Sequence, residues 1–571
     1  MPLLSESSEF SSKWSNLYES HMKEGIRDPI RAYEFMNHFY VSEGNKRVSI
    51  LKFCDAVTIP GYVTRIIPKP NHTKENRIYY EFLNFYKECG INYLNFSQIG
   101  NYKKILELLG KNFHSTWTDD EKKTFHASYY RFLKIFEKKE GRNLSLTPGD
   151  AFLIFLEIYG YEDLLKKDLS EISKEVTAIW KDFQMYPSKP SVKLLMDSKD
   201  PGPEKKRFNL NLLFPAGKLK IAFIHNKSPE TSSWTYGHEL GQAYLEDSLK
   251  EKVETKAWFH VDSPKAEQKA FEEAISWGCS VIFSTSPLLL SSSIKYAMKY
   301  PKLCVLNCSL NTGDDHIKTY YGRLYEAKFL MGAVAGIMSK NDKIGYITDY
   351  PVFGMIANIN AFALGVRMIR PEAKIYLEWS TLKHNNVEKI RKDFAISFIS
   401  DRDFMIPNKD SNRFGLYQTD GKQPVNLIMP TRNWGVFYET IAKSILDGIW
   451  KQPGNGDGKT SLNYWRGMSS DMIDVIYSSK LPSGTRQLIN LLRKSIQIGD
   501  FNPFSGAIYS QDGLVHNNPD AITPKEIVTM DWLCDNIIGS IPTMDEISDE
   551  AKSIVELQGV SKAKQTTKEL L

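Results

Sequence analysis

The chain has 571 residues, of which 42% are hydrophobic and 25% are charged, and its formal net charge is +5. A single hydrophobic core rarely grows beyond about 250–300 residues, so this length predicts more than one domain. The small, dispersed charge argues against nucleic-acid binding, and no run of about 20 apolar residues indicates a membrane span.

The N-terminal sequence MPLLSESSEFSSKW has neither the basic nor the apolar region of a signal peptide. The six cysteines are scattered, without a Cys-x-x-Cys pair or accompanying histidines, which indicates reduced thiols and no metal site. These features predict a cytoplasmic protein. No motif predicts a cofactor.

The first 185 residues show two different patterns. Residues 1–75 contain short strand-like or helical segments around a turn at Gly44, which predicts a small α+β domain. Residues 76–185 have aromatic residues at helical spacing, such as Tyr79, Phe82 and Tyr86. Such stripes usually face a core, so this part is predicted to be an all-helical module.

The second part of the chain begins after a segment rich in Pro and Lys, residues 186–218, which is predicted to be a linker. Short apolar strands then alternate with helices over residues 219–545, a pattern typical of parallel sheets covered on both faces. The predicted strands are 220–226, 280–286, 302–309, 343–348, 374–379, 394–400, 415–419 and 426–429. They are too many for one sheet, so we expect two α/β lobes with a cleft between them. The polar tail, residues 546–571, is predicted to be a loose helix or frayed.

Polar and aromatic residues follow several of the predicted strands. Ligands of open α/β sheets bind at the carboxyl ends of strands, where Trp234 and the clusters at 348–354, 418–420 and 432–435 would converge. Trp234 either packs its helix against the core or stacks on a flat ligand. No activated nucleophile accompanies these residues, so the pattern favours binding of a nucleoside or nucleobase over hydrolysis.

Three other motifs have structural interpretations. Gly454–Thr460 (GNGDGKT) lacks the glycine that a phosphate-binding loop requires, and we interpret it as a solvated loop. Gly332 and Gly336 are spaced for close packing of a helix against the sheet. His238 is expected to be a surface or capping histidine.

Several segments in order resemble the BMP family of solute-binding proteins, also known as basic membrane lipoproteins or purine nucleoside receptors. The resembling segments are SSWTYGHELG (232–241), VIFSTS (281–286), YYGRLYEAKFLMGAVAG (320–336), KIGYITDYPVFGMIANINAFALGVR (343–367), RNWGVFYETIAKSILDGIWK (432–451) and GDFNPFSGAIYSQDG (499–513). The resemblance implies a type I periplasmic-binding fold with two lobes, a hinge and a purine in the cleft. The WTYGHELG variant is similar to the branch associated with adenine-type ligands.

The family resemblance also implies which residues bind the ligand. Trp234 and Tyr236 would lie in the loop that stacks on the purine, and Asp420 would match the carboxylate that meets ribose. The loop containing Asn226 departs from the usual acidic, Gly-rich sequence, so polar recognition would differ there. The remaining residues expected to line the cleft are Arg323, Phe353, Asn433 and Trp434.

Residues 28–52 resemble the ParB/sulfiredoxin-like fold, in which a Gly-x-(Lys/Arg)-Arg turn holds nucleotide phosphates. Gly44, Asn45, Lys46 and Arg47 stand at that place, where glycine permits close approach and two cations meet phosphate. The catalytic cysteine of sulfiredoxin is absent from the motif, which argues against that reductase activity.

These patterns predict a non-enzymatic purine-binding protein, with adenine or adenosine favoured. It would serve either as a transporter component with an ABC permease as partner, associated with the plasma membrane as in the family, or as a cytosolic purine sensor with a regulatory partner. The alternative is a ParB-like enzyme that binds and hydrolyses a nucleotide.

Overall fold

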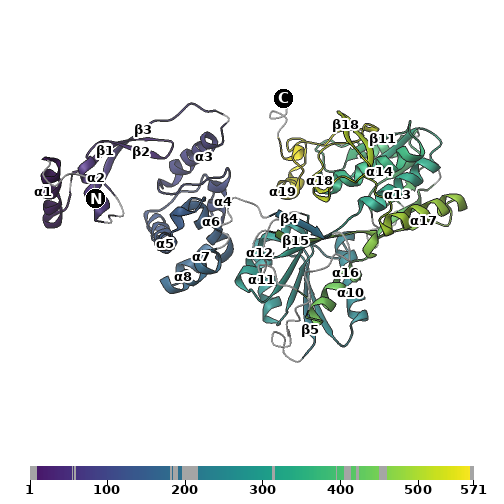
Figure 1. Ribbon diagram of the computed structural model, residues 1–571, viewed down its shortest axis with the longest axis horizontal. Helices are drawn as coiled ribbons and strands as arrows, with labels where there is room; N and C mark the ends of the chain where they lie inside the picture. The colour runs from purple at the N-terminus through teal and green to yellow at the C-terminus, as the bar shows by residue number, and fades with distance from the viewer. Residues whose placement is uncertain are drawn as a thin grey trace. The chain divides into compact units, whose positions relative to one another are not determined.

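The computed structural model describes residues 9–26, 28–54, 56, 59–71, 73–180, 183, 191–195, 217–310, 316–393, 395–403, 413–419, 423–448, 450 and 460–565. The chain divides into two compact units, Met1–Ser188 and Lys189–Leu571, and each is described by itself (Figure 1). In these described ranges, no helix is both long and apolar enough to span a membrane.

Unit 1 begins with a small three-stranded sheet. Its elements are α1 (Glu9–Glu24), β1 (Ile30–Phe35), β2 (His38–Glu43), α2 (Asn45–Phe53) and β3 (Gly61–Arg65). β1 lies in the middle, antiparallel to β2 and parallel to β3. Gly44 joins β2 to α2 with a φ of 98°, and a Cβ there would lie 2.7 Å from Ile30 Cγ2, so only glycine fits this turn.

The rest of unit 1 is helical, and its aromatic residues form the core. The elements are α3 (Lys74–Cys89), α4 (Asn101–Leu108), α5 (Asp119–Lys138), η1 (Gly141–Asn143), α6 (Pro148–Tyr159), α7 (Tyr161–Lys166) and α8 (Leu169–Ala178). Phe82, Phe132, Phe152 and Phe155 are at most 1% exposed, which confirms the predicted aromatic core. Helical spacing places these rings on the faces that pack together.

A buried carboxylate joins the small sheet to the helices. Glu34 on β1 is fully buried and accepts hydrogen bonds from the Tyr79 hydroxyl at 3.0 and 3.1 Å and from the Asn37 N–H at 2.7 Å. Arg65 on β3 supplies the opposite charge. Burial and the Glu34 carboxylate raise the pKa of Tyr79 to about 12. The sheet and α3 therefore share one polar network.

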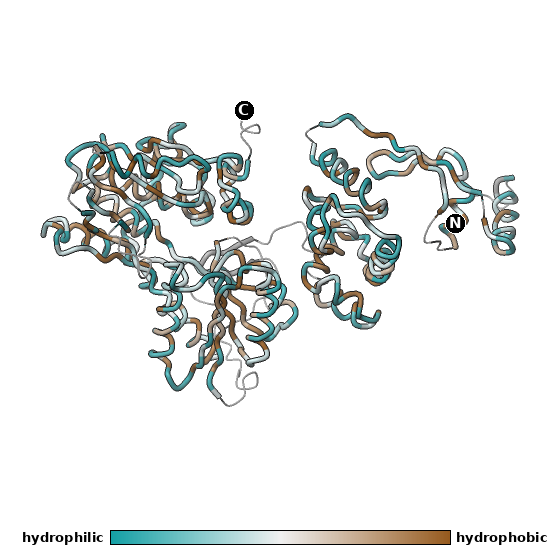
Figure 2. The backbone as a smooth tube through the Cα atoms, turned by 180° about the vertical axis from the view of Figure 1, so that it is seen from behind, coloured by the Kyte–Doolittle hydropathy of each residue, from teal (hydrophilic) through white to brown (hydrophobic). Residues whose placement is uncertain are grey.

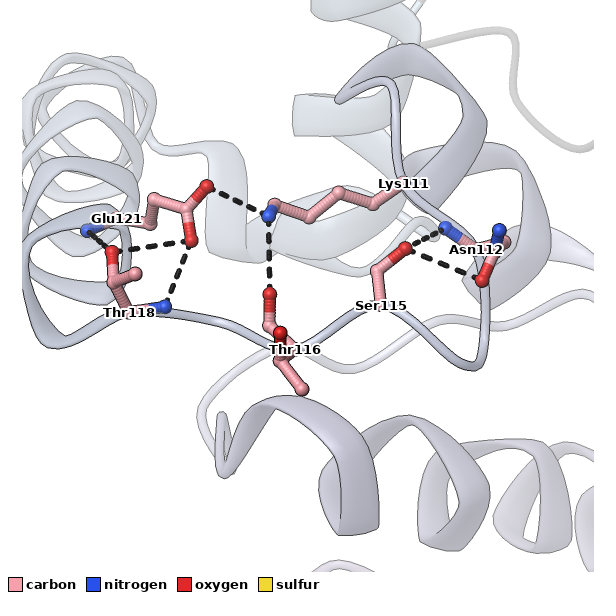
Figure 3. Close-up of polar contacts among 6 residues, drawn as sticks. All are labelled: Lys111, Asn112, Ser115, Thr116, Thr118 and Glu121. Atoms are coloured by element: carbon pink, nitrogen blue, oxygen red, sulfur yellow. Dashed lines mark hydrogen bonds and ion pairs between the residues drawn. The ribbon is translucent and has the colours of Figure 1, made fainter.

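The start of α5 is fixed by the polar network in Figure 3. Thr118 and Glu121 form a reciprocal capping box, in which each side chain accepts a hydrogen bond from the other residue's backbone N–H. The Lys111 ammonium lies 2.7 Å from Glu121 and 5.0 Å from the centre of the Trp117 ring. The network holds the loop between α4 and α5 against the helix.

The first lobe of unit 2 is a parallel seven-stranded sheet with the strand order β4-β15-β9-β8-β7-β5-β6. Its elements are β4 (Ser191–Leu195), β5 (Leu219–Ile224), α10 (Ser233–Ser248), β6 (Val253–Trp258), α11 (Pro264–Ser276), β7 (Val281–Ser284), η3 (Pro287–Leu289), α12 (Leu290–Lys299), β8 (Cys304–Cys308), β9 (Lys318–Gly322), α16 (Trp434–Leu446) and β15 (Thr460–Arg466). Figure 1 shows α11 and α12 on one face and α10 and α16 on the other. The central strands are buried on both faces, and Figure 2 shows them as continuous hydrophobic stretches.

The second lobe contains a mixed seven-stranded sheet with the order β16-β14-β13-β12-β10-β11-β19. Its elements are α13 (Tyr325–Met338), β10 (Lys343–Thr348), α14 (Met355–Ile369), β11 (Lys374–Trp379), α15 (Val387–Lys392), β12 (Phe398–Ser400), β13 (Leu416–Gln418), β14 (Val425–Arg432), η4 (Met468–Ser470), β16 (Ile473–Tyr477), α17 (Ser483–Ile498), β17 (Gly506–Ser510), β18 (Gly513–Asn518), α18 (Pro524–Val528), β19 (Ile537–Ile538), α19 (Asp549–Gln558) and η5 (Lys562–Lys564). In the described ranges, the chain passes between the lobes after β9, after β14 and after β15.

Four details differ from the sequence predictions. Gly332 packs against α14 rather than the sheet, because a Cβ there would lie 2.1 Å from the Phe362 carbonyl oxygen. The predicted linker contains β4, which pairs with β15. The predicted loose tail contains α19, which buries Val555 in the core of the second lobe. His238 is fully buried rather than at the surface. Each difference depends on contacts with residues distant in the sequence.

Candidate ligand site between the two lobes

Trp234 lies in the first turn of α10, at the end of the first lobe that faces the second. The Ser232 side chain caps this helix by accepting a hydrogen bond from the Thr235 N–H at 3.2 Å. The Trp234 indole is half-buried, and its Nε1 donates to the Thr285 carbonyl oxygen at 2.7 Å. Thr285 directly follows β7, so the indole bridges the ends of two neighbouring elements of the lobe.

Aromatic rings surround the Trp234 indole on the lobe side. Tyr321 stacks on it with centroids 5.7 Å apart, and His238 and Trp434 approach it edge to face at 5.1 and 5.6 Å. The indole thus packs on the lobe core and still keeps part of its surface accessible. The interpretation of Trp234 as a residue that packs on the core is confirmed, and stacking on a flat ligand stays a prediction.

Charged residues join Trp234 to the second lobe. The Arg432 guanidinium, at the end of β14, lies over the indole with Cζ 5.2 Å from the ring centre. The same guanidinium donates to Asp403 Oδ2 at 3.4 Å, and the other oxygen of Asp403 lies 2.5 Å from the Lys328 ammonium on α13. These contacts run from α10 of one lobe to α13 of the other.

We call the residues that make these contacts the interlobe cluster: Trp234, Thr285, Tyr321, Lys328, Asp403 and Arg432. Its ions are largely removed from water, since the side chains of Lys328 and Arg432 are 3% and 9% exposed. Burial alone would lower the pKa of Lys328, but the Asp403 carboxylate and the Tyr346 hydroxyl together outweigh it and the pKa is raised. Lys328 therefore stays charged beside Asp403.

A groove of about 570 Å³ begins beside the interlobe cluster and runs between α10 and the segment from β14 to α16. A volume of this size lies within the range of small-molecule sites. The groove is lined by Ser233, Tyr236, Gly237, Leu240, Gly241, Tyr244, Met429, Thr431, Arg432, Asn433, Trp434, Gly435 and Val436. Its aromatic and aliphatic lining suits an apolar or flat surface.

Two neutral histidines are buried beneath Trp234. His225 Nδ1 lies 2.8 Å from the Thr285 hydroxyl, and His238 Nδ1 lies 2.5 Å from the Tyr438 hydroxyl. Burial lowers the pKa of His225 to about 3, and burial, followed by the nearby His225 and Arg432, lowers the pKa of His238 strongly. Among the described residues, no group of three or more His, Cys, Asp or Glu side chains could hold a metal ion.

The structure separates two residues that the family resemblance placed together. Trp234 and Tyr236 both lie in α10 rather than in a loop, and residues two apart on a helix point about 200° apart. Tyr236 accordingly lines the groove, while Trp234 lies in the interlobe cluster. The expected position of both residues in a loop is thus wrong, and whether either ring contacts a ligand stays a prediction.

Two further predicted residues hold the chain crossings. Arg323 follows β9, is 7% exposed and bonds to Glu326 and to the Ser469 hydroxyl. Asn433 follows β14, and its side-chain amide donates to the Asp471 carbonyl oxygen at 2.8 Å. Both side chains link one crossing to the segment between β15 and β16. Their contact with a ligand stays a prediction.

The other predicted residues lie in separate places. Trp434 is 2% exposed and stacks on His238 at 4.3 Å. Phe353 lies in the second lobe, where its N–H donates to Gln558 and its ring faces Lys564 at 5.8 Å. Asn226 is half-buried after β5. Asp420 and the loop at 454–459 lie outside the described residues.

The predicted phosphate-binding turn lies at the start of α2 in unit 1. Gly44 caps the helix, and Asn45, Lys46 and Arg47 form its first turn. The Arg47 guanidinium donates to the carbonyl oxygens of Pro29 at 2.6 Å and Asp28 at 3.1 Å. Arg47 thus holds the chain before β1, and phosphate binding stays a prediction.

Five members of the interlobe cluster were not predicted as site residues from the sequence. Thr285 lies at the end of a predicted strand, 280–286, where nothing distinguished it as a site residue. Tyr321 and Lys328 lie in a segment that was recognised only by its family resemblance, and Arg432 was noted only as a cation after a strand. Asp403 follows β12, and no local pattern distinguishes it from other acidic residues. The available signal was the position of Asp403 and Arg432 after predicted strands of the second lobe.

Two α/β lobes joined by chain crossings, with candidate ligand contacts at their facing ends, are the architecture of type I periplasmic-binding proteins. Residues 218–421 match the family Bmp, described as ABC transporter substrate-binding protein PnrA-like. The chain therefore contains a Bmp substrate-binding domain. Unit 1 lies outside the matched residues.

Individual proteins similar to this chain include other binding proteins. A purine-binding protein of Brucella abortus is 27% identical over 309 residues, covering 52% of this chain and 86% of that protein. A putative ABC transporter glucose-binding protein of Haloferax volcanii is 23% identical over 244 residues, covering 38% of this chain and 62% of that protein. A solved solute-binding protein from Conexibacter woesei covers 50% of this chain and 98% of its own, with 11% identity and a TM-score of 0.39.

Proposed function

We propose that this protein captures a purine nucleobase or nucleoside, with adenine or adenosine favoured, at the interlobe cluster. The observation that carries the proposal is the half-buried Trp234 indole at the facing ends of two lobes of a Bmp domain. Aromatic rings hold bases by stacking, which tolerates different bases and needs no charged group. The similarity to a purine-binding protein supports this ligand class.

Closure of the two lobes around the ligand is the proposed mode of capture. The crossings held by Arg323 and Asn433 would act as the hinge, while Asp403 and Lys328 supply polar groups from the second lobe. Binding of this kind requires no chemical step. The neutral histidines beneath Trp234 keep the base-stacking side of the first lobe uncharged.

The test is a calorimetric titration of the full chain with adenine, adenosine, guanosine and inosine. Stacking of a base on an aromatic ring contributes about 1–3 kcal/mol, so Trp234→Ala should weaken binding roughly 5- to 150-fold. Trp258→Ala is the matched control, because Trp258 is another half-buried indole of the same lobe, whose Nε1 donates to Glu273. Equal affinities of Trp234→Ala and the wild type would refute the stacking role.

The transporter and sensor roles differ in where the protein acts. Cell fractionation, followed by co-purification with a membrane permease, separates them. Recovery with a permease supports the transporter role, whereas recovery in the soluble fraction with a regulatory partner supports the sensor role. The fractionation result does not identify the ligand, which the purine titration tests separately.

A further inference from the structure

The Arg432 guanidinium covers part of the indole that the proposed ligand needs. Its Cζ lies 5.2 Å from the centre of the Trp234 ring, within the range of a cation–π contact. A cation and a base cannot occupy the same side of one ring. A ligand that stacks on this side of Trp234 must therefore displace Arg432.

The other neighbours of Trp234 are less able to move. His238 and Trp434 are buried in the lobe core, and Tyr321 extends from β9, which is paired with β8 and β15. Arg432 is the last residue of β14, where its backbone pairs with Ile473 of β16, and its guanidinium reaches the indole through a flexible aliphatic stem. The guanidinium can therefore change position by rotation of its side chain, without a change in the backbone pairing.

A destination for the displaced cation lies beside it. Asp403 Oδ2 is already 3.4 Å from the guanidinium, a distance that can shorten to a strong charge-assisted hydrogen bond. Lys328 holds the other oxygen of Asp403, so the carboxylate keeps its place when Arg432 moves. The cluster thus offers Arg432 two neighbouring partners, one on each lobe.

We propose that Arg432 is a gate for the ligand site, which covers the Trp234 indole as in this structure and moves toward Asp403 when a flat ligand binds. This inference rests on the proposed function and adds the residue that controls access to the indole. The wild type must break the cation–π contact when a ligand binds, and a variant without Arg432 does not. The wild type should therefore bind the ligand roughly 2- to 30-fold more weakly than that variant.

The gate can first be tested without any ligand, by acrylamide quenching of tryptophan fluorescence in the full chain. Arg432→Ala should increase quenching, and the increase should disappear when Trp234 is replaced by Phe in both proteins. Arg432→Lys retains a cation and should resemble the wild type, and Arg432→Gln replaces the alanine variant if that chain does not fold. Lys256→Ala is the positive control, because Lys256 covers the Trp258 ring at 5.0 Å. Increased quenching in the Lys256 variant with none in the Arg432 variant overturns the gate.

Titration with adenosine then tests the consequence for binding. Arg432→Ala should bind roughly 2- to 30-fold more tightly than the wild type, whereas Lys256→Ala should bind equally. Weaker binding by Arg432→Ala would overturn the gate and make Arg432 a ligand contact. If no chain binds a purine, the proposed function fails, while the quenching result still decides whether Arg432 covers the indole.

Discussion

Acidification should destabilise the first lobe of unit 2, because two of its buried histidines are neutral. His225 has no exposed surface, and burial lowers its pKa to about 3 in the folded protein, against about 6.5 in an unfolded chain. The unfolded state therefore binds a proton more readily below pH 6.5. The stability contributed by neutral His225 is complete above pH 6.5 and is lost as the pH falls toward 3.

The size of the effect follows from the two pKa values. At pH 5 the unfolded chain is protonated at this site and the folded one is not, which costs about 2 kcal/mol relative to pH 8. His238, whose pKa burial also lowers, adds a loss of the same sign. A loss of this size is a large fraction of the stability of an ordinary domain.

Urea unfolding at pH 8 and pH 5 measures the effect, with His225→Asn beside the wild type. Asparagine places an amide near the position of Nδ1, so it can keep the contact with the Thr285 hydroxyl without titrating. Unit 1 is the same in both chains, so the difference between them belongs to unit 2. The wild type should lose about 2 kcal/mol more than the variant. Equal losses in the two chains would refute the account of His225.

Three further substitutions test a packing contact, a helix cap and a buried ion pair. Gly332→Ala should destabilise unit 2 by about 1–3 kcal/mol in urea unfolding, because its Cβ meets the backbone of α14. Gly484→Ala, where a Cβ meets nothing within 4 Å, should be neutral, and similar losses for both would contradict the packing explanation. Thr118→Ala should cost unit 1 about 1 kcal/mol in thermal unfolding by removing the cap of α5, and an unchanged transition would show that the capping box contributes nothing. Glu34→Ala should cost unit 1 roughly 3 kcal/mol, because it leaves Arg65 without its carboxylate; a loss below 1 kcal/mol would mean that water replaces Glu34.

The strands that could be predicted from the sequence are those with local apolar patterns. The predicted strand at 343–348 coincides with β10, and that at 374–379 coincides with β11. β9 and β15 escaped prediction, and they pair with each other across more than 130 residues of the chain, while the second neighbour of β15 is β4, which lies still further away in the sequence. Edge and crossing strands are specified by pairing partners more than by their own residues.

In the candidate site, too, local sequence predicted some features, and contacts between distant residues decided the others. Local sequence placed Trp234 at the start of a helix after a buried strand, and the structure confirms that position. It could not show that Tyr236, two residues further along the same helix, lines a groove that α10 forms with the segment from β14 to α16. Asp403 and Arg432 come near Trp234 only because the second lobe packs against the first.

The sequence by itself determined strands such as β10 and β11, the resemblance of residues 218–421 to the Bmp family and the position of the Trp234 indole after a buried strand, because each depends on residues close together in the chain. Tertiary structure alone decided that His238 is buried, that α19 belongs to the core and that Arg432 lies over Trp234. Those features depend on contacts across 100 to 200 residues, roughly, whose geometry no local pattern records.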